Sequence, residues 1–418
     1  MVRMHVKEMV TNARANYTHI TKNDIHRWIG EGRELYQPSH TLDSPSYFSS
    51  LKRFLKLRFR KVTKWVSKTF NIDEKVINQN AQNFVELVDK TQTKNNIPDL
   101  NVWNSDQSAF QYEMASGRCY DFKGTKDVLA TLVDKNSFTH THTVQYHISK
   151  AGKVGDTFLI LFQERKGKFG PRVQESIDEY VEIFKHVKIE CSSSGKMGKA
   201  NVQKWFQDVF EPDVREGEGN ILLLDSFGGQ GENAKLLTLT KKDLRIMYIP
   251  KRTTYLCQPC DLGLFRQLKG LIRPIVAVCR VNYLYGKSKM KASNRLFIVV
   301  CQSLAHNQLR ADCFVPMLKH AWQKGRYLVT EPVENFSTVT QVSFQKIAGK
   351  KCVKENCGNI CFIRCAHCSE LLCYTHFVFE YHYHKIAGEN HGPNVPRIKD
   401  LLKKFMENDA ADEDDDIE

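Results

Sequence analysis

Three aspartates stand at places in this sequence where carboxylates could hold divalent cations. Asp106 lies within the segment NVWNSDQSAF, Asp225 ends the apolar run ILLLD, and Asp261 opens the stretch DLGLF. Carboxylates from separate elements can hold two hard cations about 3.5–4 Å apart, because oxygen ligands suit Mg²⁺ and stay ionised at neutral pH. Phosphoryl-transfer nucleases use such a pair of ions. The three residues are therefore candidate catalytic residues and ligands of Mg²⁺ or Mn²⁺.

A second set of possible metal ligands is the group of cysteines and histidines that begins at residue 352. Its members form four closely spaced pairs: Cys352 and Cys357, Cys365 and Cys368, Cys373 and His376, His382 and His384. Thiolates and imidazoles at these spacings are typical of tetrahedral Zn²⁺ sites, so we expect two Zn²⁺ ions. A cross-braced order would put the first and third pairs on one ion and the second and fourth on the other. Cys361, His367 and His391 are spare candidates, so other pairings stay open.

The overall composition favours a nucleic-acid partner. The 418 residues carry a net charge of +14 with a pI of about 9.1, although seven of the last ten residues are acidic. A surface this basic attracts polyanions, and nucleic acid is the commonest one; a merely soluble basic protein is the alternative. The acidic tail, residues 407–418, is expected to be disordered. The start has no signal-peptide core and the longest apolar runs are too short to span a membrane, which favours an intracellular protein without a membrane segment.

Near the N-terminus, the segment SYFSSLKRFLKLRFRKVTKWVSKTF has the pattern of a basic amphipathic helix. Apolar residues from Phe48 to Val66 recur every three or four positions, which predicts one buried helical face. A row of cations lies largely on the other faces and could contact DNA phosphates, as in helix-turn-helix proteins; a solvated basic helix is the alternative. The candidate DNA-binding residues are Lys52, Arg53, Lys56, Arg58, Arg60, Lys61, Lys64 and Lys68.

The elements that must position the aspartates can also be read from the pattern. Residues around Asp106 alternate apolar and polar side chains and predict a strand, and residues 141–152 and 156–164 predict two more, joined by a glycine-containing turn. The run ILLLD predicts a buried parallel strand that presents Asp225 at its end, and residues 245–250 predict another. From Asp261 onward we expect a helix that Pro274 interrupts. Strands followed by an acid-bearing helix indicate an α/β domain.

The segment from about residue 101 to 270 resembles the catalytic core of the pogo/Jerky-like branch of the mariner-type DDE transposases. The flanks of all three aspartates resemble that family's motifs, and the stretch IPKRTTYLCQPCD is the most specific match. The resemblance implies a ribonuclease-H-like fold in which Asp106 bridges two Mg²⁺ ions while Asp225 and Asp261 each complete one site. It further implies cleavage of double-stranded DNA, transfer of the freed 3′-OH strand to target DNA, a nuclear site of action, and a homodimer or higher oligomer on DNA.

Some features depart from the family pattern. Gln107, Ser226 and Gln230 stand where Glu, Asn and His are frequent, although none of the three is a metal ligand by role. Only 105 residues precede Asp106, so the first of two helix-turn-helix units is expected to be missing or reduced. An alternative function therefore stays open: a domesticated, catalytically inactive nuclear DNA-binding protein derived from a transposase.

The expected organisation has three parts and a tail. Residues 1–90 form a basic helical region that loosely resembles the centromere-protein-B type helix-turn-helix, and residues 101–330 form the catalytic domain. Residues 352–384 form a small zinc finger, and residues 407–418 are the acidic tail. The finger resembles the cysteine-rich finger of piggyBac-type transposases and, more distantly, plant-homeodomain and RING fingers. DNA-end binding, chromatin contact and structural closure are all open as its role.

Overall fold

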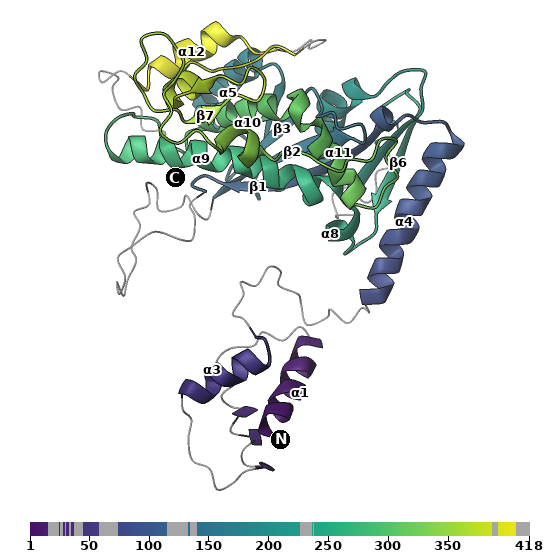
Figure 1. Ribbon diagram of the computed structural model, residues 1–418. Coiled ribbons are helices and arrows are strands. Elements are labelled where there is room, and N and C mark those ends of the chain that lie inside the picture. Colours follow the sequence, from purple (N-terminus) through teal and green to yellow (C-terminus); the bar gives the residue numbers. More distant parts are fainter. Residues whose placement is uncertain are drawn as a thin grey trace. The chain divides into compact units, whose positions relative to one another are not determined.

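The computed structural model describes residues 1–15, 45–57, 74–114, 140–225, 238–386 and 392–406, with a few single positions between them. The described chain divides into two compact units, Met1–Asp73 and Glu74–Glu418 (Figure 1). None of the described helices is long and apolar enough to cross a membrane. The acidic tail lies outside the described residues.

The smaller unit contains helices α1 (Val2–Ala15) and α3 (Pro45–Phe54). Its core consists of Val6 and Leu51 from these helices with Ile25, Trp28 and Ile29 between them, and Phe48 and Leu55 of the predicted stripe pack against it. The prediction of one long basic helix is wrong in one respect, because α3 ends at Phe54. Lys56 has a positive φ of 52°, a conformation that a helix cannot contain. The rest of the predicted helix lies outside the described residues.

The larger unit is built on a six-stranded mixed sheet with the strand order β4-β3-β2-β1-β5-β6. Strands β1, β2 and β3 form antiparallel pairs, whereas β4 and β6 extend the sheet as parallel neighbours of β3 and β5, and β5 is parallel to β1. The five strands β3-β2-β1-β5-β6, three antiparallel ones followed by two parallel ones, have the ribonuclease-H-like order that the resemblance implies, and β4 adds a sixth strand beside β3. The strands are β1 (Val102–Gln111), β2 (Thr141–Ser149), β3 (Phe158–Gln163), β4 (Val187–Ser192), β5 (Asn220–Asp225) and β6 (Leu244–Ile249).

The two faces of this sheet pack against different cores. Even-numbered residues of β1 such as Val102 and Phe110 face the larger core, together with Ile221 and Leu223 of β5. Trp103 of β1 faces the smaller core on the other side, with Leu222 and Leu224 of β5. Because side chains alternate between the faces of a strand, Asp106 and Asp225 lie on the face of the larger core.

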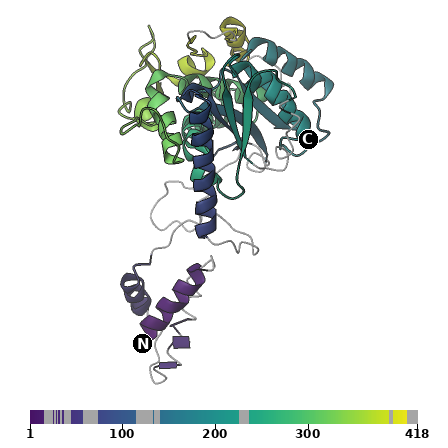
Figure 2. The ribbon, with the colours of Figure 1, turned by 90° about the vertical axis from the view of Figure 1, so that its right-hand side faces the viewer.

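Helices cover both faces of the sheet, as the two views show (Figures 1 and 2). The smaller core includes α6 (Lys199–Trp205) and the π-helical η2 (Phe206–Phe210). The larger core includes residues of α4 (Glu74–Lys94), α5 (Pro171–Ile183), α9 (Phe265–Leu284), α10 (Arg295–Leu309) and α11 (Val315–Lys324). The predicted N-terminal region of residues 1–90 is too long, because α4 belongs to the larger unit, where Phe84, Val85 and Val88 are buried.

Pro274 does not interrupt its helix, contrary to our expectation. Helix α9 continues from Phe265 to Leu284 with Pro274 inside it. A proline removes one backbone hydrogen bond and crowds the carbonyl of the residue four positions earlier. Leu271 and Ile272 before it and Ile275 and Val276 after it are all buried in the larger core, so packing on both sides outweighs that local cost.

The C-terminal segment folds onto the same core. It contains the two-stranded sheet of β7 (Ile363–Arg364) and β8 (Leu371–Leu372), the π-helical η7 (Thr375–Phe379) and helix α12 (Val395–Lys403). The remaining short elements are α8 (Thr254–Cys257), the π-helical η4 (Cys260–Leu264) and η6 (Thr340–Phe344), and the 3-10 turns η1 (Asp99–Asn101), η3 (Glu211–Asp213) and η5 (Asp312–Phe314).

Candidate active site and metal centres

Strands β1 and β5 bring Asp106 and Asp225 together. Their parallel pairing places Asn104 opposite Leu223, and each aspartate lies two residues further along its strand. Two residues is one full repeat of a strand, so both carboxylates lie on the face to which Asn104 and Leu223 belong. Both residues are partly exposed. Asp225 is the last residue of β5, where the apolar run stops.

Asp261 comes from the third element, the single π-helical turn η4. The buried side chain of Asn104 fixes this turn against the sheet: its Nδ2 donates to the carbonyl of Leu223 at 3.1 Å, and its Oδ1 accepts from the backbone N–H of Cys260 at 2.9 Å. One amide therefore joins β1, β5 and the residue directly before Asp261. Single π-helical turns occur frequently at functional sites, because they re-aim side chains within a helix.

The three aspartates are close enough for their charges to act on one another. Burial, and next the negative charge of Asp261, raises the pKa of Asp106 well above its ordinary value, and Asp225 adds to this effect. Asp261 is exposed as a residue, yet loss of water around its carboxyl group and the charge of Asp225 raise its pKa as well. Carboxylates that repel one another in this way gain most from a divalent cation between them. The donor set is therefore chemically suited to Mg²⁺ or Mn²⁺.

Lys269 of α9 is a positive side chain that acts on this site. The charge of Asp261 favours the protonated form of Lys269, but burial and the neighbouring Arg273 lower the pKa of Lys269 overall. Its Nζ lies 5.2 Å from the centre of the Phe110 ring on β1. Among the described residues, Lys269, Arg266 and Arg273 have no carboxylate within ion-pair distance, so their charges remain available to a polyanion.

The residues that depart from the family pattern are placed only in part. Gln107 lies on β1 opposite Gln145 of β2, and alternation puts its side chain on the face away from Asp106. Ser226 and Gln230 lie outside the described residues.

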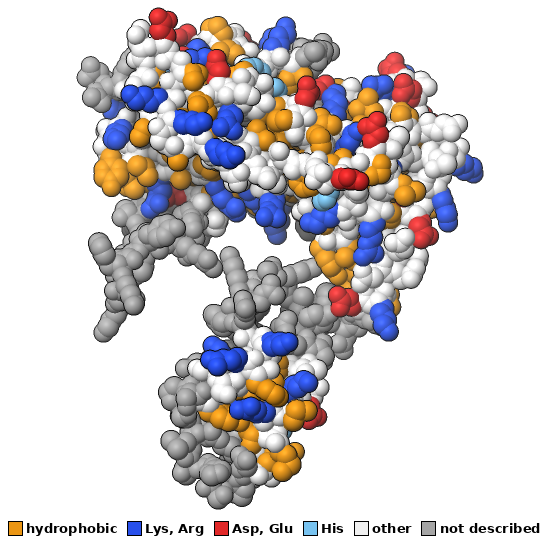
Figure 3. Space-filling view, in the orientation of Figure 1, with side chains coloured by type: hydrophobic (Ala, Val, Ile, Leu, Met, Phe, Trp, Pro, Cys, Tyr) orange, Lys and Arg blue, Asp and Glu red, His pale blue; other side chains and the backbone are white. Residues whose placement is uncertain are grey.

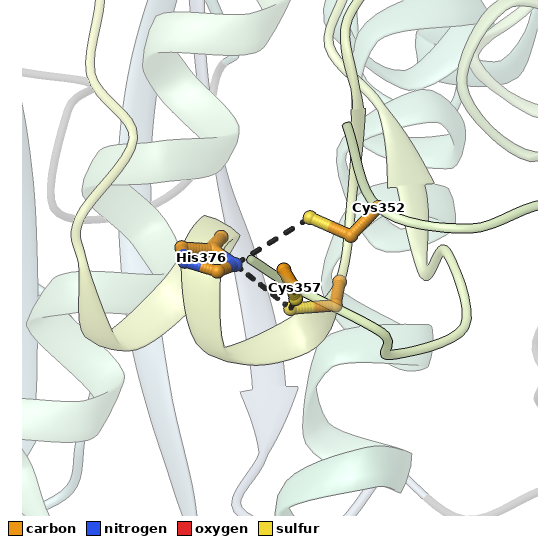
Figure 4. A group of neighbouring side chains, drawn as sticks. Cys352, Cys357 and His376 are labelled. Atoms are coloured by element: carbon orange, nitrogen blue, oxygen red, sulfur yellow. Dashed lines mark hydrogen bonds between the residues drawn. The ribbon is translucent and has the colours of Figure 1, made fainter. Parts of the chain in front are cut away.

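The first group of metal-ligand residues consists of Cys352, Cys357, Cys373 and His376, whose ligand atoms all lie within 4.8 Å of one another. Figure 4 shows His376 with its ring turned toward the sulfur atoms. Its Nδ1 lies 3.4 Å from Cys352 Sγ and 3.2 Å from Cys373 Sγ, and Cys357 Sγ lies 3.9 Å from Cys373 Sγ.

The second group consists of Cys365, Cys368, His382 and His384, again within 4.8 Å of one another. Cys368 Sγ lies 3.5 Å from Nε2 of His382, and the Nε2 atoms of His382 and His384 are 2.9 Å apart. The structure thus forms the two groups that the cross-braced order predicted. The spare candidates are engaged elsewhere, since Cys361 Sγ donates to the carbonyl of Ile363 and His367 Nε2 contacts the carbonyl of Asn307; His391 lies outside the described residues.

The contacts that involve sulfur fit a tetrahedral ion, whereas the 2.9 Å between Nε2 of His382 and Nε2 of His384 is shorter than two ligands of one ion would have. With Zn–S near 2.3 Å and Zn–N near 2.0–2.1 Å, ligand atoms of one ion lie about 3.3–3.8 Å apart. The sulfur–nitrogen distances of 3.2–3.5 Å and the sulfur–sulfur distance of 3.9 Å in the two groups are of this size. Two sets of four thiols and imidazoles at such distances suit Zn²⁺.

The predicted DNA-binding cations of the smaller unit are only partly described. Lys52 is half-buried, with its Nζ 5.3 Å from the centre of the Phe48 ring, while Arg53 and Lys56 are exposed. Arg58, Arg60, Lys61, Lys64 and Lys68 lie outside the described residues.

Sequence reasoning missed Asn104 as a residue that positions the site. A signal was present, because an amide two positions before Asp106 shares its face of the strand and therefore points toward the core. Only a long-range partner can satisfy such a buried amide. Which partner it has, the N–H of Cys260, could not be read from the sequence.

Comparison with known proteins agrees with this geometry. Residues 164–325 match the family model described as DDE superfamily endonuclease, and residues 322–384 match the Tc5 transposase C-terminal domain. No curated protein sequence matches the chain significantly.

Solved structures similar to the chain include three Mos1 complexes. The Mos1 transposase paired-end complex with left transposon end has 10% identity and a TM-score of 0.34, covering 77% of this chain and 92% of that chain. The Mos1 mariner paired end complex with Mn has 10% identity and a TM-score of 0.35, covering 77% and 98%. The corresponding complex with Mg has 11% identity and a TM-score of 0.35, covering 77% and 94%. TM-scores of this size are too low to transfer residue roles, and the family matches carry the assignment. The two family matches together cover residues 164–384, which include Asp225, Asp261 and the eight cysteines and histidines of the two groups, and by them this chain belongs to the transposases of the DDE superfamily.

Proposed function

We propose that this chain is an active transposase that cleaves double-stranded DNA with the help of divalent metal ions held by Asp106, Asp225 and Asp261, and that it transfers the freed 3′-OH end to target DNA. The observation that carries the proposal is the meeting of β1, β5 and η4, where the pairing of β1 with β5 and the Asn104–Cys260 hydrogen bond bring three aspartates near one another. The match to the DDE superfamily endonucleases supports the same chemistry.

Within this site the protein's own residues have distinct tasks. Asp106 is affected by the charges of both other carboxylates, which is consistent with the bridging role that the resemblance implies for it. Asn104 joins β1 to β5 and to the backbone before Asp261, so it positions the elements that carry the three carboxylates. Bound divalent ions would supply Lewis-acid stabilisation of the phosphoryl oxygens and a more acidic attacking water.

Helix α9 supports the proposal that DNA is the substrate. Arg266, Lys269 and Arg273 lie at a spacing of three and four residues, which puts them along one side of α9 a few residues beyond Asp261. Figure 3 shows Lys and Arg side chains on the side of the larger unit along which α9 runs. Cations without carboxylate partners gain most from phosphates, so this stripe is suited to hold the DNA backbone near the carboxylates.

The proposal also includes zinc binding, an oligomer on DNA and a nuclear site of action. The two groups of cysteines and histidines would each hold one Zn²⁺ ion, and zinc analysis of the purified chain tests that. A homodimer or higher oligomer on DNA and a nuclear site of action complete the proposal. They are supported by the family membership and the basic charge, and they are tested by sizing the complex on DNA and by imaging the tagged chain in cells.

The decisive experiment is cleavage of end-labelled duplex DNA by the purified chain in Mg²⁺ or Mn²⁺, with Ca²⁺ as the inert ion. Asp225→Asn is the matched variant, because it keeps the shape of the side chain and removes its charge. We expect metal-dependent nicking that the variant loses while it still binds DNA. Equal cleavage by the variant would refute the proposed site. DNA binding without cleavage in the wild type would favour the domesticated, inactive DNA-binding protein.

A further inference from the structure

Helix α10 is buried along its length, yet its second half is polar. Every residue from Leu296 to Leu309 is buried, and the last two turns include Gln302, Ser303, His306, Asn307 and Gln308. Buried polar side chains are costly unless each has a hydrogen-bond partner. Their partners therefore show what this helix joins.

One set of partners belongs to the second group of metal ligands, Cys365, Cys368, His382 and His384. Asn307 Nδ2 donates to the carbonyl of His384 at 2.7 Å, and Asn307 Oδ1 accepts from the N–H of the same residue at 3.1 Å. Gln308 Nε2 donates to Cys365 Sγ at 3.4 Å, and Gln308 Oε1 accepts from the N–H of Ala366 at 2.7 Å. Two adjacent amides thus hold the first and the last ligand of this group.

The other set of partners belongs to the catalytic sheet. Gln302 Nε2 lies 2.9 Å from Nε2 of His142 on β2, and His306 Nε2 lies 2.8 Å from the carbonyl of Gly155 in the turn between β2 and β3. Burial lowers the pKa of His142 to about 3, so this contact is between neutral groups at neutral pH. Strand β2 is the antiparallel neighbour of β1 and places Tyr146 opposite Asp106.

The apolar contacts run the same way. Ile363, Leu372, Phe377 and Val378 of the C-terminal segment are buried in the core that also contains β1, β2 and α10. Helix α12 adds ion pairs from Arg397 to Glu179 and Glu182 of α5. A module that read DNA independently would have a core of its own, whereas the core of this finger is continuous with that of the catalytic sheet.

We propose that Asn307 and Gln308 hold the ligands of the second metal group in place, and that this group serves to attach the C-terminal segment to α10 of the same chain. The inference rests on the proposed zinc binding. Amides that fix a metal's ligands from outside orient them and tune the affinity, and their loss typically weakens binding 10–100-fold. A metal ion in this group therefore locks α10 onto β2 and stabilises the sheet that carries Asp106.

The test compares two glutamines of the same helix in the full-length chain. Gln308→Met removes the amide that contacts Cys365, and Gln302→Met removes one that faces β2 instead; both glutamines are buried, and methionine has a similar length. Zinc is measured by competition with a chromogenic chelator. We expect Gln308→Met and Asn307→Ala to lower the affinity for one of the two zinc ions about 10–100-fold, and Gln302→Met to leave the affinity for both ions unchanged.

A second measurement needs no variant at α10. Hydrogen exchange of the wild type is compared before and after zinc removal, and also with Cys368→Ser, which removes an exposed ligand of the same group. We expect faster exchange in α10 and β2 in both cases. The inference would be overturned if Gln308→Met still bound two zinc ions tightly, or if hydrogen exchange in α10 and β2 did not change after zinc removal. The proposal that the chain binds zinc would survive either result. A wild type without zinc would overturn both, whatever the cleavage assay shows.

Discussion

The contact between Gly263 and Ala321 gives a quantitative test of how Asp261 is positioned. Gly263 lies in η4 two residues after Asp261, and a Cβ atom placed on it would lie 2.4 Å from the Cβ of Ala321 on α11. Carbon atoms pack best at about 3.5–4.0 Å, so Gly263→Ala must push η4 and α11 apart by roughly 1 Å. Overpacking of this kind costs about 1–3 kcal/mol of unfolding free energy.

The partner substitution makes the prediction specific. Ala321→Gly removes the opposing methyl group and costs about 1 kcal/mol by itself, because glycine weakens a helix interior. In the double variant the clash is absent, so we expect it to be at least 1 kcal/mol more stable than the sum of the two single effects predicts. Urea unfolding measures the four stabilities.

DNA cleavage gives the functional side of the same cycle. A shift of about 1 Å at a catalytic group far exceeds the tolerance of a positioned site, so Gly263→Ala should reduce the cleavage rate by about 100-fold. The double variant should recover most of that loss, since Asp261 returns to its place. Strictly additive stabilities, or cleavage by Gly263→Ala at the wild-type rate, would refute the packing that we describe.

Three further predictions follow from the site. Asn104→Ala leaves the buried N–H of Cys260 and the carbonyl of Leu223 without their side-chain partner, so we expect a loss of about 2–5 kcal/mol in urea unfolding and weaker Mn²⁺ binding; a Mn²⁺ affinity equal to that of the wild type would contradict the positioning role. Because the folded-state pKa of Asp106 is raised, its charge destabilises the metal-free fold at neutral pH, and this cost disappears as the pH falls through the raised pKa toward the ordinary value of 3.8. Metal-free Asp106→Asn should therefore melt above the wild type at pH 7 but not near pH 4, and saturating Mn²⁺ should reverse the order at pH 7; a lower melting temperature of the metal-free variant at pH 7 would contradict this. Lys269→Met should weaken DNA binding by the cleavage-inactive Asp225→Asn chain and reduce the salt dependence of that binding by about one phosphate contact, whereas Lys188→Met on edge strand β4 should not; identical salt slopes would remove Lys269 from the DNA interface.

Much of the site could be predicted from sequence because its signals are local. An apolar run that ends in Asp225 forms a buried strand, and alternation around Asp106 also marks a strand, although β1 is buried on both faces at its start. Two parallel strands must bring their equivalent positions together, so the pairing of the carboxylates follows from the strand assignment. The four pairs of cysteines and histidines could be predicted for a similar reason, because short spacings let both members of a pair reach one ion. Which two pairs lie together stayed open until the structure showed the two groups.

What the sequence did not predict depends on long-range packing. Pro274 ends helices by local chemistry, yet α9 passes through it because its neighbours are buried on both sides. The break after Phe54 depends on the positive φ of Lys56, which no residue preference indicated. The partners of Asn104, Asn307 and Gln308 are far along the chain or on another element, and only the folded structure shows that these amides hold ligands in place.

The most direct test of the central claim is a crystal structure of the chain grown in Mn²⁺, with anomalous scattering recorded at the manganese edge. We expect one or two anomalous peaks among Asp106, Asp225 and Asp261, at carboxylate–metal distances of about 2.0–2.3 Å, and none in Asp225→Asn or a single weaker one. Three carboxylates with ordered side chains and no anomalous peak at saturating Mn²⁺ would contradict the assignment of this site as the metal centre of a nuclease.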